Sequence, residues 1–139
     1  MNNLKQSFYA MIKDDATFKT YTGATASDPR FYQAFTEGEP VVTAAKPGFA
    51  VYRFNEGAAT QANAGQDGDI PVFVDVFART DYDAQRIKDR LIALLHEQRI
   101  TTATKRTLRI VYNGATSLFD AQERVVHEAM TFTMLCVFS

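Results

Sequence analysis

The chain has 139 residues, of which 46% are hydrophobic and 22% charged, a composition that fits one folded domain and excludes disordered and fibrous classes of protein. Fifteen basic and sixteen acidic residues give a net charge of −1, so the chain has no overall field that would attract nucleic acid or anionic lipid. We expect no membrane partner, because no apolar run approaches the ~18 residues of a membrane span and no signal peptide is evident.

The first predicted element is an amphipathic helix over residues 4–14, because apolar residues recur there every three or four positions. A second, short helical turn fits residues 16–21. The segment 28–48 contains three prolines, which remove backbone donors and oppose helix formation. We therefore predict an irregular segment, held to the core as a helical turn or an edge strand by its aromatic residues Phe31, Tyr32 and Phe35.

A strand is predicted over residues 49–54, followed by a loop over residues 55–69. The loop contains no large apolar residue, so burial cannot repay the entropy of ordering it. A loop of this length inside a compact domain is uncommon and is often functional. We expect it to be flexible in the free chain and to order against a partner.

The clearest pattern is a strand over residues 71–79 that leads directly into a helix ending at Leu95. The strand is rich in β-branched and aromatic residues on both faces, as an interior strand would be. Thr80 or Asp81 is predicted to cap the helix. The helix buries one stripe, formed by Ala84, Ile87, Leu91, Leu94 and Leu95.

The C-terminal part predicts two more strands, over residues 107–112 and 126–138. The first would end at an Asn113-Gly114 turn, and the loop 115–124 would fold Leu118 and Phe119 back onto the sheet. The last strand alternates, with Glu128 the one charged residue on its apolar face. The fold class is thus α+β, a single domain over residues 1–139 with a mixed or antiparallel sheet of about four strands flanked by two main helices.

The residues that could carry chemistry are few. His96 ends a predicted helix, His127 lies on the polar face of the last strand, and the single cysteine, Cys136, lies on its apolar face. We interpret these three as a solvated, a surface and a core residue, respectively. There is no zinc-ligand spacing and no phosphate-binding glycine loop, so we predict no enzyme, cofactor or metal site.

Asp75 is the most unusual residue, because a carboxylate on an interior strand needs a partner if it is buried. Arg79 lies on the same strand face and Arg109 on a strand that could be adjacent. We predict a structural ion pair among Asp75, Arg79 and Arg109 rather than a catalytic carboxylate. Together with Arg109, Lys105-Arg106 forms the only short basic cluster, which we interpret as solvated.

One block resembles the small tail-terminator or tail-completion proteins of tailed bacteriophages, which join the tail to the head. The block runs Val72-Phe73-Val74-Asp75-Val76-Phe77-Ala78-Arg79-Thr80, with Ala84-Gln85-x-Ile87 and Leu91-x-x-Leu94-Leu95 after it. The opening Leu4-Lys5-Gln6 and the closing Leu118-Phe119-Asp120 and Met130-Thr131-Phe132 are also similar to that family.

The resemblance implies a structural virion subunit, made in the host cytoplasm, that forms a ring, usually a hexamer, at the head-proximal end of the tail. Its partners would be further copies of itself, the tail-tube protein and the connector proteins, with DNA passing through the lumen only as cargo. Ring subunits need edges and loops that order on contact. We assign subunit contacts to the two predicted loops, with the candidates Glu56, Gln61, Gln66, Asp67, Asp69, Asp120, Gln122, Glu123 and Arg124.

Two other classes of function remain open. The first is a small α+β ligand-binding or regulatory module, in which the aromatic segment from Phe31 to Phe35 lines a pocket. The second is a hydrolase that uses Asp75 or His127.

Overall fold

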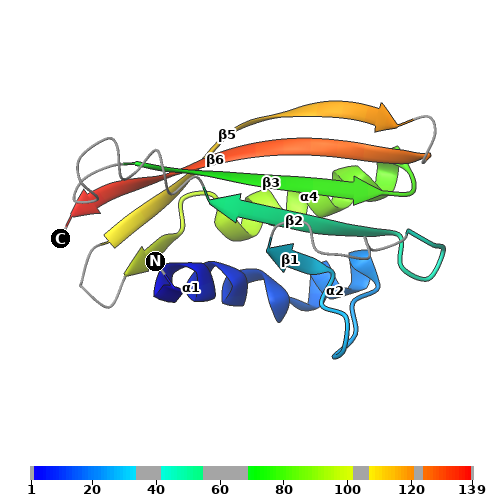
Figure 1. Cartoon of the computed structure of the whole chain (residues 1–139), viewed down its shortest axis with the longest axis horizontal. Helices are drawn as coiled ribbons and strands as arrows, with labels where there is room; N and C mark the ends of the chain where they lie inside the picture. Colours follow the sequence, from blue (N-terminus) through cyan, green and yellow to red (C-terminus); the bar gives the residue numbers. More distant parts are fainter. Residues whose placement is uncertain (1, 34–41, 55–68, 102–106, 121–123, 139) are drawn as a thin grey trace.

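The structure is a computed structural model that describes residues 2–33, 42–54, 69–101, 107–120 and 124–138. It has the predicted α+β class, with three helices and six strands in one curled, mixed sheet (Figure 1). The sequence predicted a sheet of about four strands. The two additional strands were missed because each is only three residues long, too short to give a recognisable pattern.

The elements follow one another as α1 (Asn2–Lys13), α2 (Ala16–Thr22), β1 (Phe31–Gln33), β2 (Gly48–Phe54), β3 (Ile70–Ala78), α4 (Asp81–Leu95), β4 (Arg99–Thr101), β5 (Thr107–Asp120) and β6 (Val125–Phe138). Strand order in the sheet is β1-β2-β3-β6-β5-β4. β1 pairs with β2 in parallel, and the other neighbours are antiparallel. β1 and β4 are therefore the two edge strands, and β5 and β6 form one long hairpin.

Helix α1 forms as the periodicity predicts, with Leu4, Phe8 and Ile12 buried along one stripe. Asp15 caps α2, because its carboxylate accepts the Phe18 backbone N–H at 2.8 Å. The helix ends at Gly23, whose φ of +73° is in the left-handed region.

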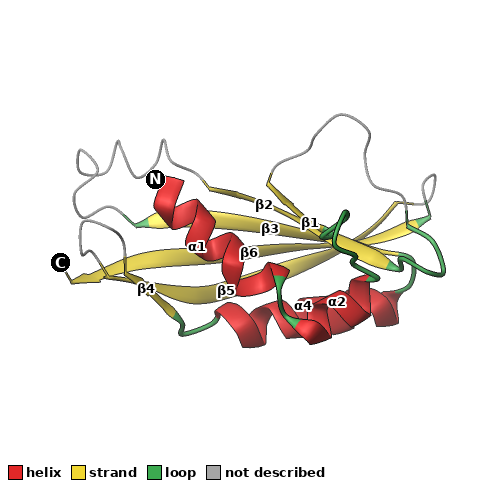
Figure 2. Cartoon of the chain, turned by 90° about the horizontal axis from the view of Figure 1, so that it is seen from below, coloured by secondary structure: helices red, strands yellow, loops and turns green. Residues whose placement is uncertain are grey.

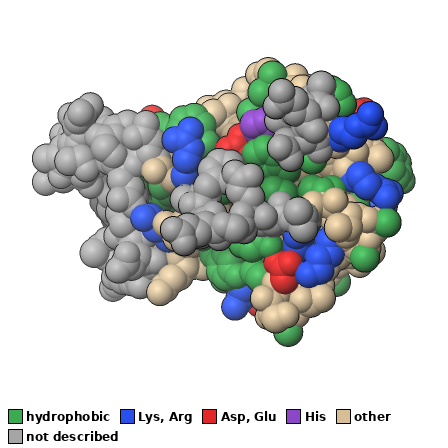
Figure 3. Space-filling view, turned by 45° about the vertical axis from the view of Figure 1, so that its right-hand side comes forward, with side chains coloured by type: hydrophobic (Ala, Val, Ile, Leu, Met, Phe, Trp, Pro, Cys, Tyr) green, Lys and Arg blue, Asp and Glu red, His purple; other side chains and the backbone are tan. Residues whose placement is uncertain are grey.

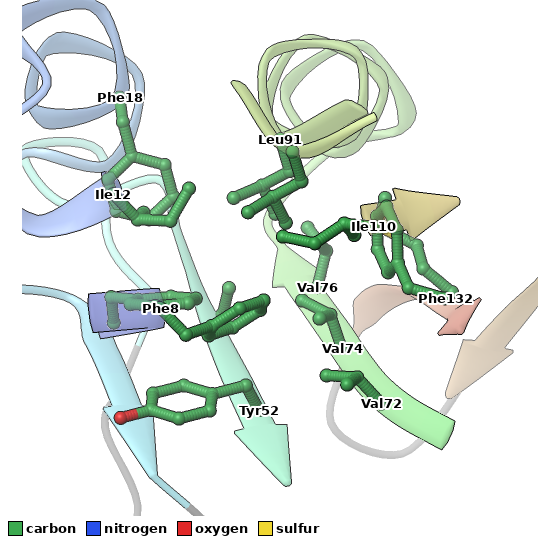
Figure 4. Packing of buried hydrophobic residues seen from close by; sticks show 14 of the residues in the cluster. Phe8, Ile12, Phe18, Tyr52, Val72, Val74, Val76, Leu91, Ile110 and Phe132 are labelled. Atoms are coloured by element: carbon green, nitrogen blue, oxygen red, sulfur yellow. The ribbon is translucent and has the colours of Figure 1, made fainter. Parts of the chain in front are cut away.

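The β3–α4 unit is confirmed, with Thr80 as the N-cap of the helix. Its hydroxyl accepts the Asp83 N–H at 3.1 Å. Alternate residues of β3, including Val72, Val74 and Val76, are fully buried. They face the buried stripe of α4, and Phe8 of α1 and Tyr52 of β2 extend the same core sideways (Figure 4). Burial of apolar side chains between the sheet and the three helices thus drives the fold.

The predicted turn at Asn113-Gly114 is wrong, since β5 continues through it to Asp120. The register with β6 shifts between Tyr112 and Gly114, and Gly114 has a φ of +131°. Asn-Gly therefore forms a β-bulge, a local irregularity that tolerates the same positive φ as a tight turn.

The predicted loop 115–124 is also wrong, because its first part is the end of β5. Leu118 and Phe119 do not fold back onto the sheet but are 51% and 66% exposed. For the last strand, the predicted apolar face is confirmed at Glu128, Met130, Phe132 and Met134, which are all buried, and Val126 is half-buried. The side chains of Cys136 and Phe138 lie outside those that the structure describes. In the irregular segment, Phe31 and Tyr32 form the edge strand β1. Phe35 and most of the loop 55–69 lie outside the described residues.

We expect Asp15→Asn to lower the free energy of unfolding by about 1–2 kcal/mol at pH 7, because it keeps the cap but loses the two charged hydrogen bonds from Arg90. Arg90 holds the pKa of the Asp15 carboxyl below its usual value. The native chain is therefore more stable than Asp15→Asn above the unfolded-state pKa of about 3.9. This difference in the free energy of unfolding is lost as pH falls through the lower folded-state pKa of Asp15.

Urea unfolding of both chains between pH 7 and pH 2 measures this difference. The exposed neighbour Asp14 supplies a matched control, Asp14→Asn, which should change stability by less than about 0.5 kcal/mol. Equal effects of the two substitutions at pH 7 would show that the Arg90 pair does not stabilise the fold.

Candidate assembly surface

All three helices lie on one face of the sheet (Figure 2). The opposite face, which we call the open face, carries no helix in the described part of the chain. Strand alternation places Phe49 and Val51 of β2, Phe73, Asp75 and Phe77 of β3, and His127 of β6 on the open face. These side chains do not belong to the core under the helices, although Phe49 and Val51 are themselves buried, at 5% and 3% exposed. The half-exposed members, Phe73, Asp75, Phe77 and His127, are the candidates for function.

A row of rings crosses the open face. Phe49 and Phe77 are register partners with ring centroids 5.1 Å apart, and Phe77 and His127 are register partners at 4.4 Å. Tyr32 meets Phe49 edge-on at 6.0 Å, and Leu118 of β5 lies opposite His127. Such cross-strand contacts stabilise neighbouring strands and fix their register.

Asp75 has a different partner from the arginines that the sequence suggested. His127 Nε2 lies 2.8 Å from Asp75 Oδ1, and the two side chains are only 24% and 20% exposed. Arg109 pairs instead with Glu97 at 3.2 Å. β6 separates β3 from β5, which removes Arg109 from reach, and Arg79 lies four residues along an extended strand, roughly 13 Å away.

A histidine held by a carboxylate could act as a general base if a nucleophile lay beside it. Among the described residues, no hydroxyl or thiol is hydrogen-bonded to His127, whose hydrogen bond is to Asp75. The described residues also contain no group of three or more His, Cys, Asp or Glu side chains arranged to hold a metal ion. In the described residues the pair forms a polar contact between β3 and β6.

On the helix side, a buried polar cluster joins the hairpin to α4. Glu128 is fully buried, and its Oε1 accepts hydrogen bonds from Gln85 at 2.9 Å and Lys88 at 3.0 Å. Burial raises the pKa of the Glu128 carboxyl, but the Ser117 hydroxyl, Lys88 and Gln85 outweigh it and lower that pKa overall. Oε2 nevertheless accepts no hydrogen bond of normal geometry. The sequence showed Glu128 as an exception on an apolar face but gave no sign of its partners.

Beyond this cluster the hairpin ends in exposed apolar side chains. We call Gly114–Phe119 of β5 and Val125–Ala129 of β6 the hairpin end. Leu118 lies on the open face and Phe119 on the other. β4 pairs with β5 only from Thr107 to Arg109. Figure 3, which brings this end of the molecule forward, shows hydrophobic side chains at the surface between Lys and Arg side chains.

The predicted contact residues are only partly described. Asp69 precedes β3 and is exposed, Asp120 ends β5, and Arg124 precedes β6, exposed and with a φ of +56°. The other six lie outside the described residues: Glu56, Gln61, Gln66, Asp67, Gln122 and Glu123. The structure thus brings Asp120 and Arg124 to the same hairpin.

A groove of about 400 Å³ lies at the opposite edge of the sheet, between α1 and the strands β1 and β2. Its lining residues are Lys5, Gln6, Tyr9, Pro29, Phe31, Tyr32, Gln33 and Tyr52. Four of these are aromatic, and Phe31 stacks on two of them, Tyr52 at 4.6 Å and Tyr9 at 6.0 Å between ring centroids. Two of the aromatic residues that the sequence suggested for a pocket, Phe31 and Tyr32, are among them.

Comparison with known proteins gives a likeness in structure but none in sequence. No family model and no curated protein matches the sequence. Among solved structures, a protein in the virion of a native gene transfer agent particle is similar, with a TM-score of 0.69 and 12% sequence identity. The match covers 96% of this chain and 94% of that one. The chain therefore has the fold of a protein from a gene transfer agent virion. In the described part of the chain, no helix is long and apolar enough to cross a membrane.

We expect Glu128→Ala to destabilise the protein by about 3 kcal/mol, because it leaves the largely buried ammonium of Lys88 without its partner. Replacing both residues by methionine should recover most of this loss, since no buried charge then remains. Glu97→Ala, which breaks an exposed pair with Arg109, is the control and should lose less than about 1 kcal/mol. Urea unfolding midpoints measure all three. A double variant as unstable as Glu128→Ala would contradict this reading of the cluster.

Proposed function

We propose that this chain is a structural subunit of a phage-like virion, a tail terminator that forms a homo-oligomeric ring at the head-proximal end of the tail. In this role a ring, usually a hexamer, stops polymerisation of the tail tube and provides the surface that joins the tail to the head. The tail-tube protein and the connector proteins are its partners, and DNA passes through the lumen as cargo.

The observation that carries the proposal is the fold shared with a gene transfer agent virion protein over 96% of the chain. The sequence block from Val72 to Thr80, on which the resemblance to tail-terminator proteins rests, forms β3 and the N-cap of α4 at the centre of that fold. The likeness in fold and the likeness in sequence therefore support the same class of protein.

The arrangement of the sheet suits a ring subunit. A ring is built from one repeated contact between two different surfaces of the same chain. Among the described strands, the sheet ends at β1 on one side, has a long hairpin near the other edge and carries the open face between them. These surfaces lie on different sides of the fold. Neighbouring subunits could therefore bind one another through the sheet edges, while the open face or the helices bind other proteins.

The proposed role is structural, so no catalytic residue is assigned. The pair formed by Asp75 and His127 and the row of rings beside it are proposed to keep the open face in one shape during assembly. Asp69, Asp120 and Arg124 are proposed as subunit contacts, in line with their exposed or hairpin positions.

A second candidate function is a ligand-binding or regulatory module, which the aromatic groove favours. Its volume of about 400 Å³ falls within the usual range for a small-molecule site. Thermal unfolding with a panel of metabolites tests it, and a shift that Tyr9→Ala abolishes would support it over the ring.

Assembly with tail tubes tests the leading proposal. The protein is added to purified tail-tube protein while tubes grow, and negative-stain microscopy records tube length and tube ends. We expect rings at one end of each tube and shorter tubes, because the ring blocks further addition. Tubes of unchanged length with uncapped ends, and a protein that stays monomeric in their presence, would contradict the proposal.

A further inference from the structure

The outer edge of β5, on the side away from β6, is covered only at its start. Among the described residues, β4 pairs with β5 as far as Arg109, and the turn before β4 binds the backbone N–H and C=O of Ile110. The Tyr112 N–H donates to His96 Nδ1 at 3.0 Å. Beyond Tyr112 no described strand pairs with this side of β5 (Figure 1). We call the outer edge of residues 113–119 the bare edge.

Three residues of the bare edge turn their backbone N–H and C=O groups outward. In an antiparallel sheet, these groups alternate along a strand between its two sides. Ile110 directs both groups outward, and it lies opposite Met134 of β6. Ala115, Ser117 and Phe119 lie opposite residues of β6 that are an even number of positions from Met134. The backbone groups of these three residues therefore also point to the outer side.

The bare edge lacks most of the features by which proteins prevent strands from pairing. Residues 112–119 include no charged side chain and no proline, and residues 115–119 are all exposed. The bulge at Gly114 is the one irregularity, and no atom lies within 4 Å of the place that a Cβ would take there. Charges and prolines are the usual guards of a free edge. An exposed, uncharged edge without them is suited to accept another strand.

The side chains of the bare edge define the strand that it can accept. Leu118 lies on the open face and Phe119 on the helix side, at 51% and 66% exposed. A strand added beside them has to be extended, uncharged and apolar on both faces. The same segment of a second copy has each of these properties. The chain thus contains a strand that matches its own edge.

We propose that two copies of the chain pair antiparallel through their bare edges, with Ser117 on the two-fold axis between them. In this register, Ala115 lies opposite Phe119 of the second copy, so all the outward backbone groups of one copy meet those of the other and can exchange N–H···O=C bonds. On the open face, Thr116 lies opposite Leu118 of the second copy. Each large side chain thus packs beside a small one, and no like charges face each other.

The two-fold contact goes beyond the proposed ring and does not depend on it. A two-fold contact uses the same surface of both copies and closes after two, whereas a ring repeats a contact between two different surfaces. The contact is also small, because only two large side chains of each copy take part and both are partly buried already. Small interfaces are transient, so we expect a dissociation constant of roughly 10–100 μM.

Disulfide trapping at the two-fold axis tests the register in the full chain. In a Cys136→Ser background, Ser117→Cys brings two thiols opposite each other. Hydrogen-bonded opposite residues have Cα atoms about 5.5 Å apart, which a disulfide can span. Asn113→Cys, on the same strand and exposed, is the matched control, because this register separates its two copies by roughly 26 Å. Both variants are oxidised in a glutathione buffer, above the expected dissociation constant, and separated without reductant.

We expect Ser117→Cys to give a covalent dimer about tenfold or more faster than Asn113→Cys, because pairing raises the effective concentration of its thiols. Equal rates for the two variants, or no dimer from Ser117→Cys, would overturn the inference.

Sedimentation of the native chain over a range of concentrations tests the pairing without introduced cysteines. Phe119→Lys places a charge on the bare edge, and Tyr82→Lys changes a 70% exposed aromatic residue of α4 as the control. Both variants should keep the native unfolding temperature, because both side chains are exposed. We expect Phe119→Lys to raise the dissociation constant of the dimer about tenfold or more, and Tyr82→Lys to leave it unchanged. Equal dissociation constants for the two variants would contradict the inference.

The same samples with tail-tube protein separate this inference from the proposed function. A native chain that stays monomeric alone, but binds tail-tube protein through an edge that Phe119→Lys disrupts, would show that the edge serves another virion protein and would overturn the inference. Capped tubes from a chain that never dimerises would overturn the inference and leave the proposed function intact. Dimers that never cap tubes would support the inference and contradict the proposed function.

Discussion

The structure depends on burial of one face of the sheet by the three helices. Alternate residues of β3 and β6 meet the apolar stripe of α4, and α1 covers the aromatic residues of β2 beside them. This one-sided burial fixes the register of each strand, because a shift by one residue would move the apolar set to the opposite face. It also fixes which side chains the open face presents. The row of rings and the pair of Asp75 and His127 thus follow from the same alternation that builds the core.

The hairpin end is held by the pairing of β6 with β3, from Asp75 opposite Ala129 to Ala78 opposite Val126, and by a few polar contacts to α4. Glu128 binds Lys88 and Gln85 of α4 from the buried face of β6, and the bulge at Gly114 changes the register of β5 just before its last residues. A carboxylate without water around it makes strong, directional contacts only with matched donors. Such an anchor holds the hairpin at a defined angle to the helices while leaving Leu118 and Phe119 exposed. A protein that assembles through this hairpin needs both properties.

Much of this fold could be predicted from the residues because local patterns determine it. The β3–α4 unit has a clear strand, a capping threonine and a helical stripe, and each formed where expected. The bulge was mistaken for a turn because Asn-Gly supports positive φ in both. Asp75 was assigned the wrong partners because the sequence does not reveal that β6 lies between β3 and β5. Leu118 and Phe119 were expected to be buried because hydrophobicity does not show whether a strand end has a helix beside it. The groove joins α1 to the distant strands β1 and β2, which local patterns could only suggest through Phe31 and Tyr32.

Hydrogen exchange of the free and the tube-bound protein tests most directly whether the hairpin end and the β1 edge are assembly surfaces. Exchange measured by mass spectrometry reports protection of backbone amides peptide by peptide. We expect peptides from the hairpin end and from β1 to gain protection on assembly, while those from α4, already protected by the core, change little. Protection gained only in the helices, with the hairpin end exchanging as fast as in the free chain, would contradict it.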